Sequence, residues 1–344
     1  MKRKIIILLI SCMVALVACS RKASEQATVD NANIDTSLKT VDEEKESSTE
    51  NATQSVSEDQ GLLYESFLRN DAKVHVNSEY DFGDYSFEEV NDQDLTIGEI
   101  VNFLMGDATE DDNAWLTYTN YSYIDCGNDG VPELAIVVNP PSDLGGWSKY
   151  IIIKDIDGKL QTVYSELAWE RGTVNINEYG YISENSTSGA AYHGFKKSFV
   201  DSAGKWHYIF SDETTDCIVP GGDLWFKGNS HICPNDIVGE YAFLEFDFNN
   251  SIEDFADNVY TYAKWDGDAS ESWIEGEQIY FYRKLIKDSM QYDDSHPLKK
   301  FFDENALHIY TLDEIEQMIV EKEKEEGLTD FIKQGKNVEW LELK

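Results

Sequence analysis

Basic residues are scarce in this chain of 344 residues. It carries 28 Lys and Arg side chains against 66 Asp and Glu, which gives a formal net charge of −38 at pH 7. A surface with this charge repels nucleic-acid phosphates and anionic lipid headgroups, so the sequence predicts no nucleic-acid partner. The charge favours solubility at a negatively charged cell surface, and the attraction of cations or basic partners is the alternative interpretation.

Long apolar runs are absent after the first twenty residues. Within those twenty, three basic residues at positions 2–4 precede a largely apolar run over 5–17. This layout is typical of a secretory signal, and the run is shorter than the ~20 apolar residues of a transmembrane helix. We therefore expect export of the chain without a membrane-spanning helix.

The end of this run, Leu16-Val17-Ala18-Cys19, resembles the lipobox of bacterial lipoproteins. The resemblance implies a signal peptide at 1–18 and a diacylated Cys19 as the new N-terminus. Two acyl chains provide stable anchoring, at roughly 0.8 kcal/mol for each buried CH₂ group. The mature protein is then tethered to the outer face of the bacterial cytoplasmic membrane, with a Gram-positive cell favoured. An ordinary signal peptide with an incidental Cys19 is the alternative.

Aromatic residues are absent before Tyr64, and all 43 of them lie from there onward. Residues 20–60 contain twelve Ser or Thr, ten acidic and four basic residues, and their few apolar side chains are isolated. Such a segment buries too little apolar surface to offset its chain entropy. We interpret residues 19–60 as the lipidated N-terminus and a disordered acidic linker. Residues 61–344 form the globular region, which carries −35 of the net charge.

The globular region begins with helical periodicity and then changes to strands. Residues 61–110 have apolar positions at helical spacing, and Thr96-Ile-Gly-Glu99 matches a capping box. Residues 111–235 follow a period of two, with glycine-containing turns such as 155–158. Short strands joined by such turns predict successive antiparallel hairpins.

Helical patterns return in the last third of the chain. Residues 236–344 are predicted to be mostly helical, with helices over 252–263 and 277–290 and a third helix after a capping box that begins at Thr311. The predicted fold class is α+β, in which a central antiparallel β-meander, a sandwich or barrel-like sheet, is flanked by N- and C-terminal helical segments.

The stretch 123–138, YIDCGNDGVPELAIVV, places an acidic loop between two strand-like runs. Oxygens at alternate loop positions can converge on one cation, and Gly130 permits the sharp turn. The pattern resembles the Asp-Gly calcium loop of integrin-type (FG-GAP) hairpins, which implies a Ca²⁺ site that stabilises the hairpin. Gly127 lacks a side-chain oxygen and only one copy is present, so a metal-free turn at 128–130 is the alternative. The candidate ligands are Asp125, Asp129, the Val131 carbonyl and Glu133.

Cysteines are few, and three remain after Cys12 leaves with the signal and Cys19 is lipidated. These three are Cys126, Cys217 and Cys233. In an oxidising compartment, a disulfide between Cys217 and Cys233 is predicted, and it would contribute roughly 3 kcal/mol. Two alternatives are three reduced, buried thiols, and a zinc site that adds His231 but lacks a fourth ligand.

Familiar catalytic motifs are also absent. The chain contains no His-Glu-x-x-His, Gly-x-Ser-x-Gly or phosphate-binding glycine loop, and we assign no catalytic residue. The sequence therefore favours a non-enzymatic binding or envelope-associated lipoprotein, with a cell-envelope glycan or protein as ligand. The alternative is a lipid-anchored hydrolase acting on glycan or peptide through a carboxylate pair that sequence cannot single out. Four tryptophans can stack on sugar rings, although burial in the core is the expected use of most: Trp147, Trp169, Trp206 and Trp225.

Overall fold

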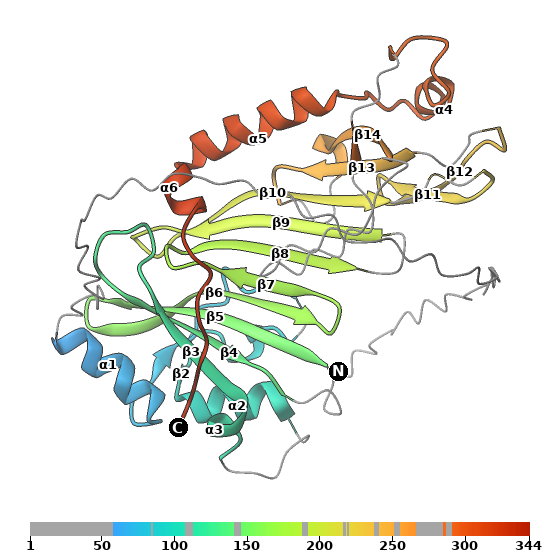
Figure 1. Cartoon of the computed structure of the whole chain (residues 1–344). Helices are drawn as coiled ribbons and strands as arrows, with labels where there is room; N and C mark the ends of the chain where they lie inside the picture. The colour runs from blue at the N-terminus through green and yellow to red at the C-terminus, as the bar shows by residue number, and fades with distance from the viewer. Residues whose placement is uncertain are drawn as a thin grey trace, which may run out of the picture. The chain divides into compact units, whose positions relative to one another are not determined.

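The structure is a computed structural model in which the chain divides into two units, Met1–Ala52 and Thr53–Lys344. It describes residues 58–83, 85–106, 113–140, 146–187, 192–215, 218, 220–236, 241–250, 255–265, 285–286 and 291–344, all of them in the second unit. Within these ranges, no helix has the length and apolar character needed to cross a membrane. The described residues form an α+β fold (Figure 1).

The N-terminal helical zone contains the predicted helices and two short strands. The Thr96 capping box is confirmed, because the Thr96 hydroxyl accepts a hydrogen bond from the Glu99 amide and the Glu99 carboxylate accepts one from the Thr96 amide. The helix that follows ends at Gly106. The elements of this zone are α1 (Glu58–Leu68), β1 (Val74–His75), the 3₁₀ helix η1 (Phe87–Val90), β2 (Asp94–Leu95), α2 (Ile97–Met105) and α3 (Ala114–Tyr118).

The first sheet has, in the described part of the chain, the strand order β16-β3-β4-β5-β6-β1-β2. Four strands adjacent in sequence are antiparallel neighbours in space, which confirms the predicted meander: β3 (Thr119–Ile124), β4 (Glu133–Val138), β5 (Trp147–Ile156) and β6 (Lys159–Trp169). The β5–β6 turn holds Asp157 and Gly158 at φ of 55° and 81°, as a two-residue hairpin turn requires. Strand β1 joins β6 in parallel, and β16 (Leu341–Glu342) closes the other edge.

The second sheet has the order β15-β14-β13-β10-β9-β8-β7. Its neighbours are all antiparallel within the described residues. Its strands are β7 (Thr173–Ile176), β8 (Tyr181–Thr187), β9 (Tyr192–Val200), β10 (Trp206–Thr215), β13 (Tyr241–Asp247), β14 (Val259–Trp265) and β15 (Leu285–Ile286). A separate hairpin pairs β11 (Asp223–Phe226) with β12 (Asn229–Ile232).

The helix predicted over 252–263 is wrong. Residues Phe255–Asp257 form a single 3₁₀ turn, η4, and β14 follows it in antiparallel pairing with β13. The run from Val259 to Tyr262 is β-branched and aromatic, which suits a strand with both faces buried, and pairing with β13 overrides the helical spacing. Of the helix predicted over 277–290, only Leu285–Ile286 lies within the described residues, and these two residues form strand β15.

The remaining helices follow in the last 46 residues. A capping box at Thr311 begins α5 (Leu312–Glu326), as predicted, and the helix ends at Gly327 in a left-handed conformation (φ 83°). It is preceded by α4 (Lys299–Glu304) and followed by α6 (Asp330–Lys333). The described residues of 236–344 therefore mix strands with helices, and most of these residues are not helical.

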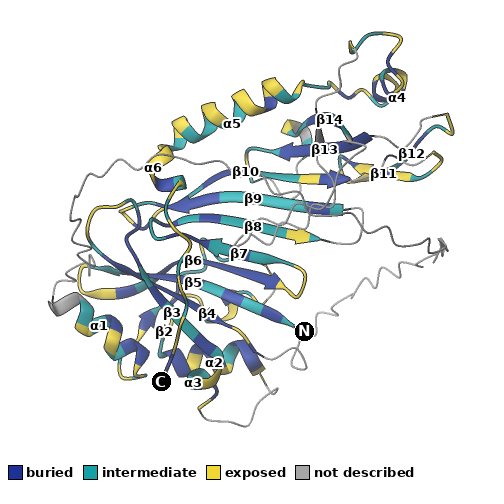
Figure 2. Ribbon diagram, viewed as in Figure 1, coloured by how far each residue is buried: buried dark blue, intermediate teal, exposed yellow. Residues whose placement is uncertain are grey.

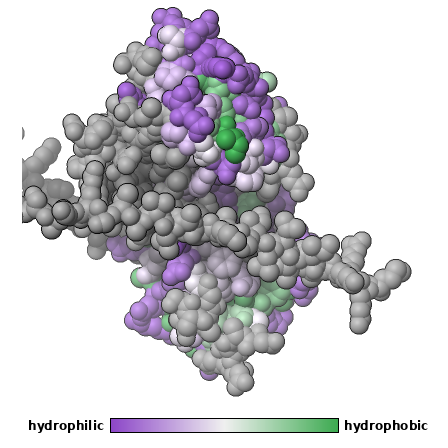
Figure 3. Space-filling view, turned by 90° about the vertical axis from the view of Figure 1, so that its right-hand side faces the viewer, coloured by the Kyte–Doolittle hydropathy of each residue, from purple (hydrophilic) through white to green (hydrophobic). Residues whose placement is uncertain are grey.

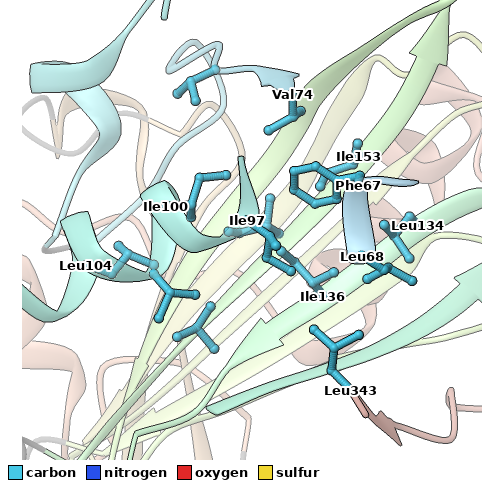
Figure 4. Close-up of a cluster of buried hydrophobic side chains, with 14 of the residues drawn as sticks. Phe67, Leu68, Val74, Ile97, Ile100, Leu104, Leu134, Ile136, Ile153 and Leu343 are labelled. Atoms are coloured by element: carbon cyan, nitrogen blue, oxygen red, sulfur yellow. The ribbon is translucent and has the colours of Figure 1, made fainter. Parts of the chain in front are cut away.

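The first sheet is buried on both faces. Alternate residues of β4, such as Leu134 and Ile136, pack with the apolar faces of α1 and α2, including Phe67 and Ile100 (Figure 4). Intervening residues such as Ala135 belong instead to a cluster that joins this sheet to β7 and β8 of the second. Burial on both faces explains why β4 is a continuous apolar run after Glu133 and why the interior strands are dark blue in Figure 2.

The second sheet is covered in part by the C-terminal helices. Ile315 of α5 and Ile332 of α6 pack with apolar side chains of β10, β13 and β14. Phe301 and Phe302 of α4 form a further cluster with Phe226 and Phe243. On the face seen in Figure 3, hydrophilic residues dominate the upper part around one small apolar area, as the acidic composition leads us to expect.

Candidate ligand-binding cleft

The structure contains a cleft of about 700 Å³ where the end of β6 meets the middle of the second sheet. Its lining comes from the 81–83 segment, from β6 to β10, from β13 and from the segment after β13. A cavity of this volume suits a small molecule or part of a polymer. Of these residues, only Trp169 was a candidate from the sequence.

Strand register brings the polar side chains of the cleft onto one face of the second sheet. Residues paired across neighbouring strands project to the same face, as do residues two apart along one strand. One cross-strand row runs Glu184–Lys196–Ser211–Asp247, and the next runs Ser186–Gly194–Glu213–Glu245. These residues come from four strands, and only the pairing of those strands makes them neighbours.

Lys196 lies between two carboxylates that come from different sheets. Its Nζ is 2.8 Å from Glu184 Oε2 in β8 and also contacts Glu166 Oε2 in β6. The Tyr164 hydroxyl donates a hydrogen bond to Glu184 Oε1 at 2.9 Å. All three charged side chains keep at most 18% of their solvent exposure. This cluster, Glu166–Lys196–Glu184, links the two sheets at the floor of the cleft.

Burial changes the proton affinities in this cluster. Burial, together with repulsion from Glu166, raises the pKa of Glu184 to about 8. Burial opposes the charge on Lys196, but the two carboxylates raise the pKa of Lys196 above its usual value. One ammonium group therefore faces two carboxyl groups, and the second carboxyl group holds a proton near neutral pH.

A second pair of carboxyl groups faces the cleft directly. Glu213 of β10 and Glu245 of β13 are directly opposite each other in the ladder. Partial burial and the charge of Glu245 raise the pKa of Glu213. Glu245 Oε1 accepts hydrogen bonds from Asn258 Nδ2 at 2.9 Å and from the Tyr260 hydroxyl at 3.1 Å. Burial raises the pKa of the neighbouring Asp212 to about 7, against the effect of a hydrogen bond from Thr214.

The cleft carries an excess of negative charge. Lys149, behind the cleft, places its Nζ 2.6 Å from Asp81 Oδ1 and compensates that carboxylate. With this ammonium counted, with Glu184 protonated and with Asp212 projecting to the opposite face of β10, the described lining retains two negative charges in excess. The acidic lining residues are Asp81, Glu166, Glu184, Asp212, Glu213, Glu245 and Asp247, and the basic ones are Arg171 and Lys196.

The predicted calcium loop is a tight turn in which its carboxylates already accept hydrogen bonds from the protein. Asp125 accepts bonds from the amides of Asp129 (2.8 Å) and Gly130 (3.1 Å), and Asp129 accepts one from the Val131 amide (2.8 Å). In the described part of the chain, no hydrogen bond is formed to the Val131 carbonyl. Across the described residues, no three or more His, Cys, Asp or Glu side chains are grouped as metal ligands. The calcium site stays a prediction.

Glu133, the fourth predicted ligand, is completely buried away from the loop surface. It accepts a hydrogen bond from the Cys126 amide at 2.7 Å and forms an ion pair with Lys154 Nζ. Burial raises the pKa of Glu133, although Lys154 acts in the opposite direction. A cation that recruits Glu133 must therefore compete with the Lys154 ammonium.

The structure leaves the disulfide and zinc alternatives as predictions. Cys217 lies outside the described residues, and Cys233 is buried in the cluster around Phe226. His231 stacks on the Phe226 ring with centroids 3.7 Å apart. Cys126 is fully buried, and burial raises the pKa of its thiol well above the usual value. Such a thiol is a poor nucleophile.

The four tryptophans divide evenly between core and surface. Trp147 and Trp206 are buried, so the expected burial holds for two of the four and not for most of them. Trp169, at the end of β6, is 47% exposed and lines the cleft, and Trp225 is 52% exposed on the β11–β12 hairpin. Trp169 is therefore the one of these four that lines the cleft.

Comparison with known proteins gives no relative for this chain: no family model, no curated protein and no solved structure matches it. The function is accordingly inferred from the cleft.

Proposed function

We propose that this chain is a lipid-anchored binding protein at the outer face of the bacterial cytoplasmic membrane and that it binds a positively charged ligand in the cleft. The observation that carries the proposal is the excess of two negative charges in a partly buried cavity of about 700 Å³. The lipobox at Cys19 supports the location, and the segment at 19–60 supports a spacer between the membrane and the cleft.

The electrostatics of the cleft favour cations over neutral or anionic ligands. Glu213 lies opposite Glu245, and partial burial together with the repulsion between them raises the pKa of Glu213. An ammonium group placed beside these carboxylates relieves that repulsion and replaces the water that they lose on binding. Because the ammonium favours the ionised form of Glu213, binding should release protons and should strengthen as the pH rises.

The test is calorimetric binding of a tetralysine peptide to the full-length protein at pH 6, 7 and 8. The double variant Glu213→Gln/Glu245→Gln removes two charges from the cleft and should weaken binding at least tenfold. The matched control, Glu321→Gln/Glu325→Gln, removes two charges from the exposed face of α5 and should change binding less than twofold. Equal weakening in both variants would show diffuse attraction by the acidic surface and would refute the cleft as the site.

A lipid-anchored hydrolase acting on glycan or peptide is the second candidate, and one observation favours it. Glu213 and Glu245 are neighbouring carboxyl groups, and the pKa of Glu213 is raised. A protonated acid beside an ionised carboxylate is the arrangement that glycoside hydrolysis requires. Release of reducing ends or amino termini from envelope polymers by the wild type, and its loss in Glu213→Gln, would favour this candidate over simple binding.

A further inference from the structure

Two exposed aromatic side chains lie side by side at the rim of the cleft. Tyr85 and Trp169 are 43% and 47% exposed, and their ring centroids are 6.1 Å apart with planes inclined by 51°. A flat ligand ring can therefore stack on one of the two rings and contact the edge of the other. Tyr85 also stacks on the buried Trp147, with centroids 5.0 Å apart and planes inclined by 29°. We call this exposed pair, Tyr85 and Trp169, the aromatic platform.

The fold holds the aromatic platform in place from both sides. Trp147 and Trp169 are directly paired across β5 and β6 and so project to the same face, where Trp147 lies beneath the Tyr85 ring. The segment that leads to Tyr85 is fixed to β6, because the Phe82 amide donates to the Ser165 carbonyl at 2.9 Å. Gly83 is close enough to β6 that an added Cβ would lie 2.9 Å from Leu167 Cβ.

Tyr85 itself adopts a backbone conformation, with φ of 55°, that residues other than glycine seldom adopt. Such a conformation is strained and persists where the surrounding structure fixes it. The aromatic platform is thus an ordered surface feature, and its rings lose little freedom on contact with a ligand.

The platform continues into a polar part of the cleft. Trp169 lines the cleft together with Arg171, and amide and hydroxyl side chains line it farther along β8, including Asn185, Ser186 and Thr187. A pyranose ring has an apolar face of C–H groups, which packs on aromatic rings, and a rim of hydroxyl groups, which bonds to amides and carboxylates. A lysine side chain binds carboxylates and can place its ammonium group over an aromatic face, but it has no hydroxyl groups for the amide and hydroxyl side chains of β8.

We propose that the ligand of the cleft is a glycan with free amino groups, one ring of which stacks on the aromatic platform of Tyr85 and Trp169. This inference rests on the proposed function, because the acidic lining supplies the contacts for the amino groups. It adds the ligand class and a stacking subsite that the acidic lining alone does not imply.

The experiment compares three probes with the full-length protein: the glucosamine tetrasaccharide with free amines, its fully N-acetylated form, and tetralysine. The amine-bearing sugar should bind most tightly. Trp169→Ala should weaken the binding of this sugar about tenfold, as expected for the loss of one stacked ring. Trp169→Phe, which keeps an aromatic ring, should retain most of the binding, and tetralysine binding should change less than twofold in either variant.

Trp225→Ala is the matched control, since Trp225 is equally exposed but lies outside the cleft lining. Equal weakening of sugar binding by Trp169→Ala and Trp225→Ala would overturn the stacking subsite. Equal binding of the acetylated and amine-bearing sugars would overturn the requirement for amino groups. If the loss of Glu213 and Glu245 still weakens tetralysine binding in either case, the proposed function stands without this inference. If no probe depends on those two carboxylates, the proposed function fails as well.

Discussion

Glu184→Gln should make the protein less sensitive to alkaline pH. In the wild type, burial and the charge of Glu166 raise the pKa of Glu184 from 4.5 to about 8. A carboxyl group whose pKa is raised by folding stabilises the folded state below its unfolded value, and that contribution is lost as the pH rises through the folded value. Glu184 therefore favours folding most below about pH 4.5 and has lost most of this effect at pH 8.

The magnitude follows from the two pKa values. One pKa unit corresponds to about 1.4 kcal/mol, and between pH 5 and pH 8 the contribution of Glu184 to the free energy of unfolding falls by roughly 3 kcal/mol. Glutamine is neutral at every pH, can still accept the hydrogen bond from Tyr164, and leaves Lys196 paired with Glu166. We expect the variant to be less stable than the wild type by about 1 kcal/mol at pH 5, for one imperfect hydrogen bond.

The assay is urea unfolding of the full-length protein at five pH values from 5 to 9, followed by tryptophan fluorescence. The quantity to plot is the free energy of unfolding of the variant minus that of the wild type, which cancels the titration of Asp212 and other groups. This difference should increase by roughly 3 kcal/mol from pH 5 to pH 8. Glu170→Gln, at an exposed site on the same rim, should give a flat line. A flat line for Glu184→Gln would refute the reasoning.

Three further outcomes are expected. Cys19→Ala should accumulate as precursor or appear in the medium, and normal maturation with membrane retention would exclude the lipobox. If Cys217 and Cys233 are bridged, the intact mass under non-reducing conditions should be two hydrogens below the reduced value, with Cys126 the single alkylatable thiol; three alkylatable thiols would exclude the bridge. Calcium should raise the melting temperature. At a hundredfold excess over Kd, it should stabilise the folded state by about 2.7 kcal/mol. Magnesium should do less, and an identical rise in Asp129→Asn would show diffuse binding to the acidic surface.

Local chemistry made part of the fold predictable from sequence. The capping boxes at Thr96 and Thr311 need only residues three apart, and both form as predicted. The turn at Asp157–Gly158 needs two residues that tolerate positive φ, and it joins β5 to β6, the longest strand among the described residues. These signals act within one turn of the chain, where no distant partner can change the outcome.

Strands whose identity depends on distant partners were harder to predict. Val259–Trp265 becomes a strand because its backbone pairs with β13 along one edge and because residues on both of its faces pack into the core. The apolar spacing of 252–263 is compatible with a helix when read alone. Tertiary pairing decided between the two structures, and that information lies outside the segment.

The cleft was unpredictable for the same reason, although one signal was present. The cleft brings together residues that are far apart in the sequence: Glu184, Lys196, Glu213 and Glu245. Each is 12 to 32 positions from the next, and only strand register places them on one face. A charge in the middle of an otherwise apolar strand is costly unless it has a partner. Glu245, between Leu244 and Phe246, is such a charge. The sequence could mark it as unusual but could not identify its neighbours.

The acidic loop shows why a ligand pattern is weaker than a ligand geometry. The alternate oxygens of Asp125 and Asp129 that can converge on a cation converge equally well on backbone N–H groups, and in the structure they do. Glu133 has the spacing of a ligand, yet it is buried against Lys154, which lies 21 positions farther along the chain. The loop pattern contains nothing about that lysine. Calcium can bind here as the pattern implies only by drawing Glu133 from its ammonium partner or by replacing that carboxylate with water, so calcium affinity measures the strength of a buried ion pair as much as the quality of the loop.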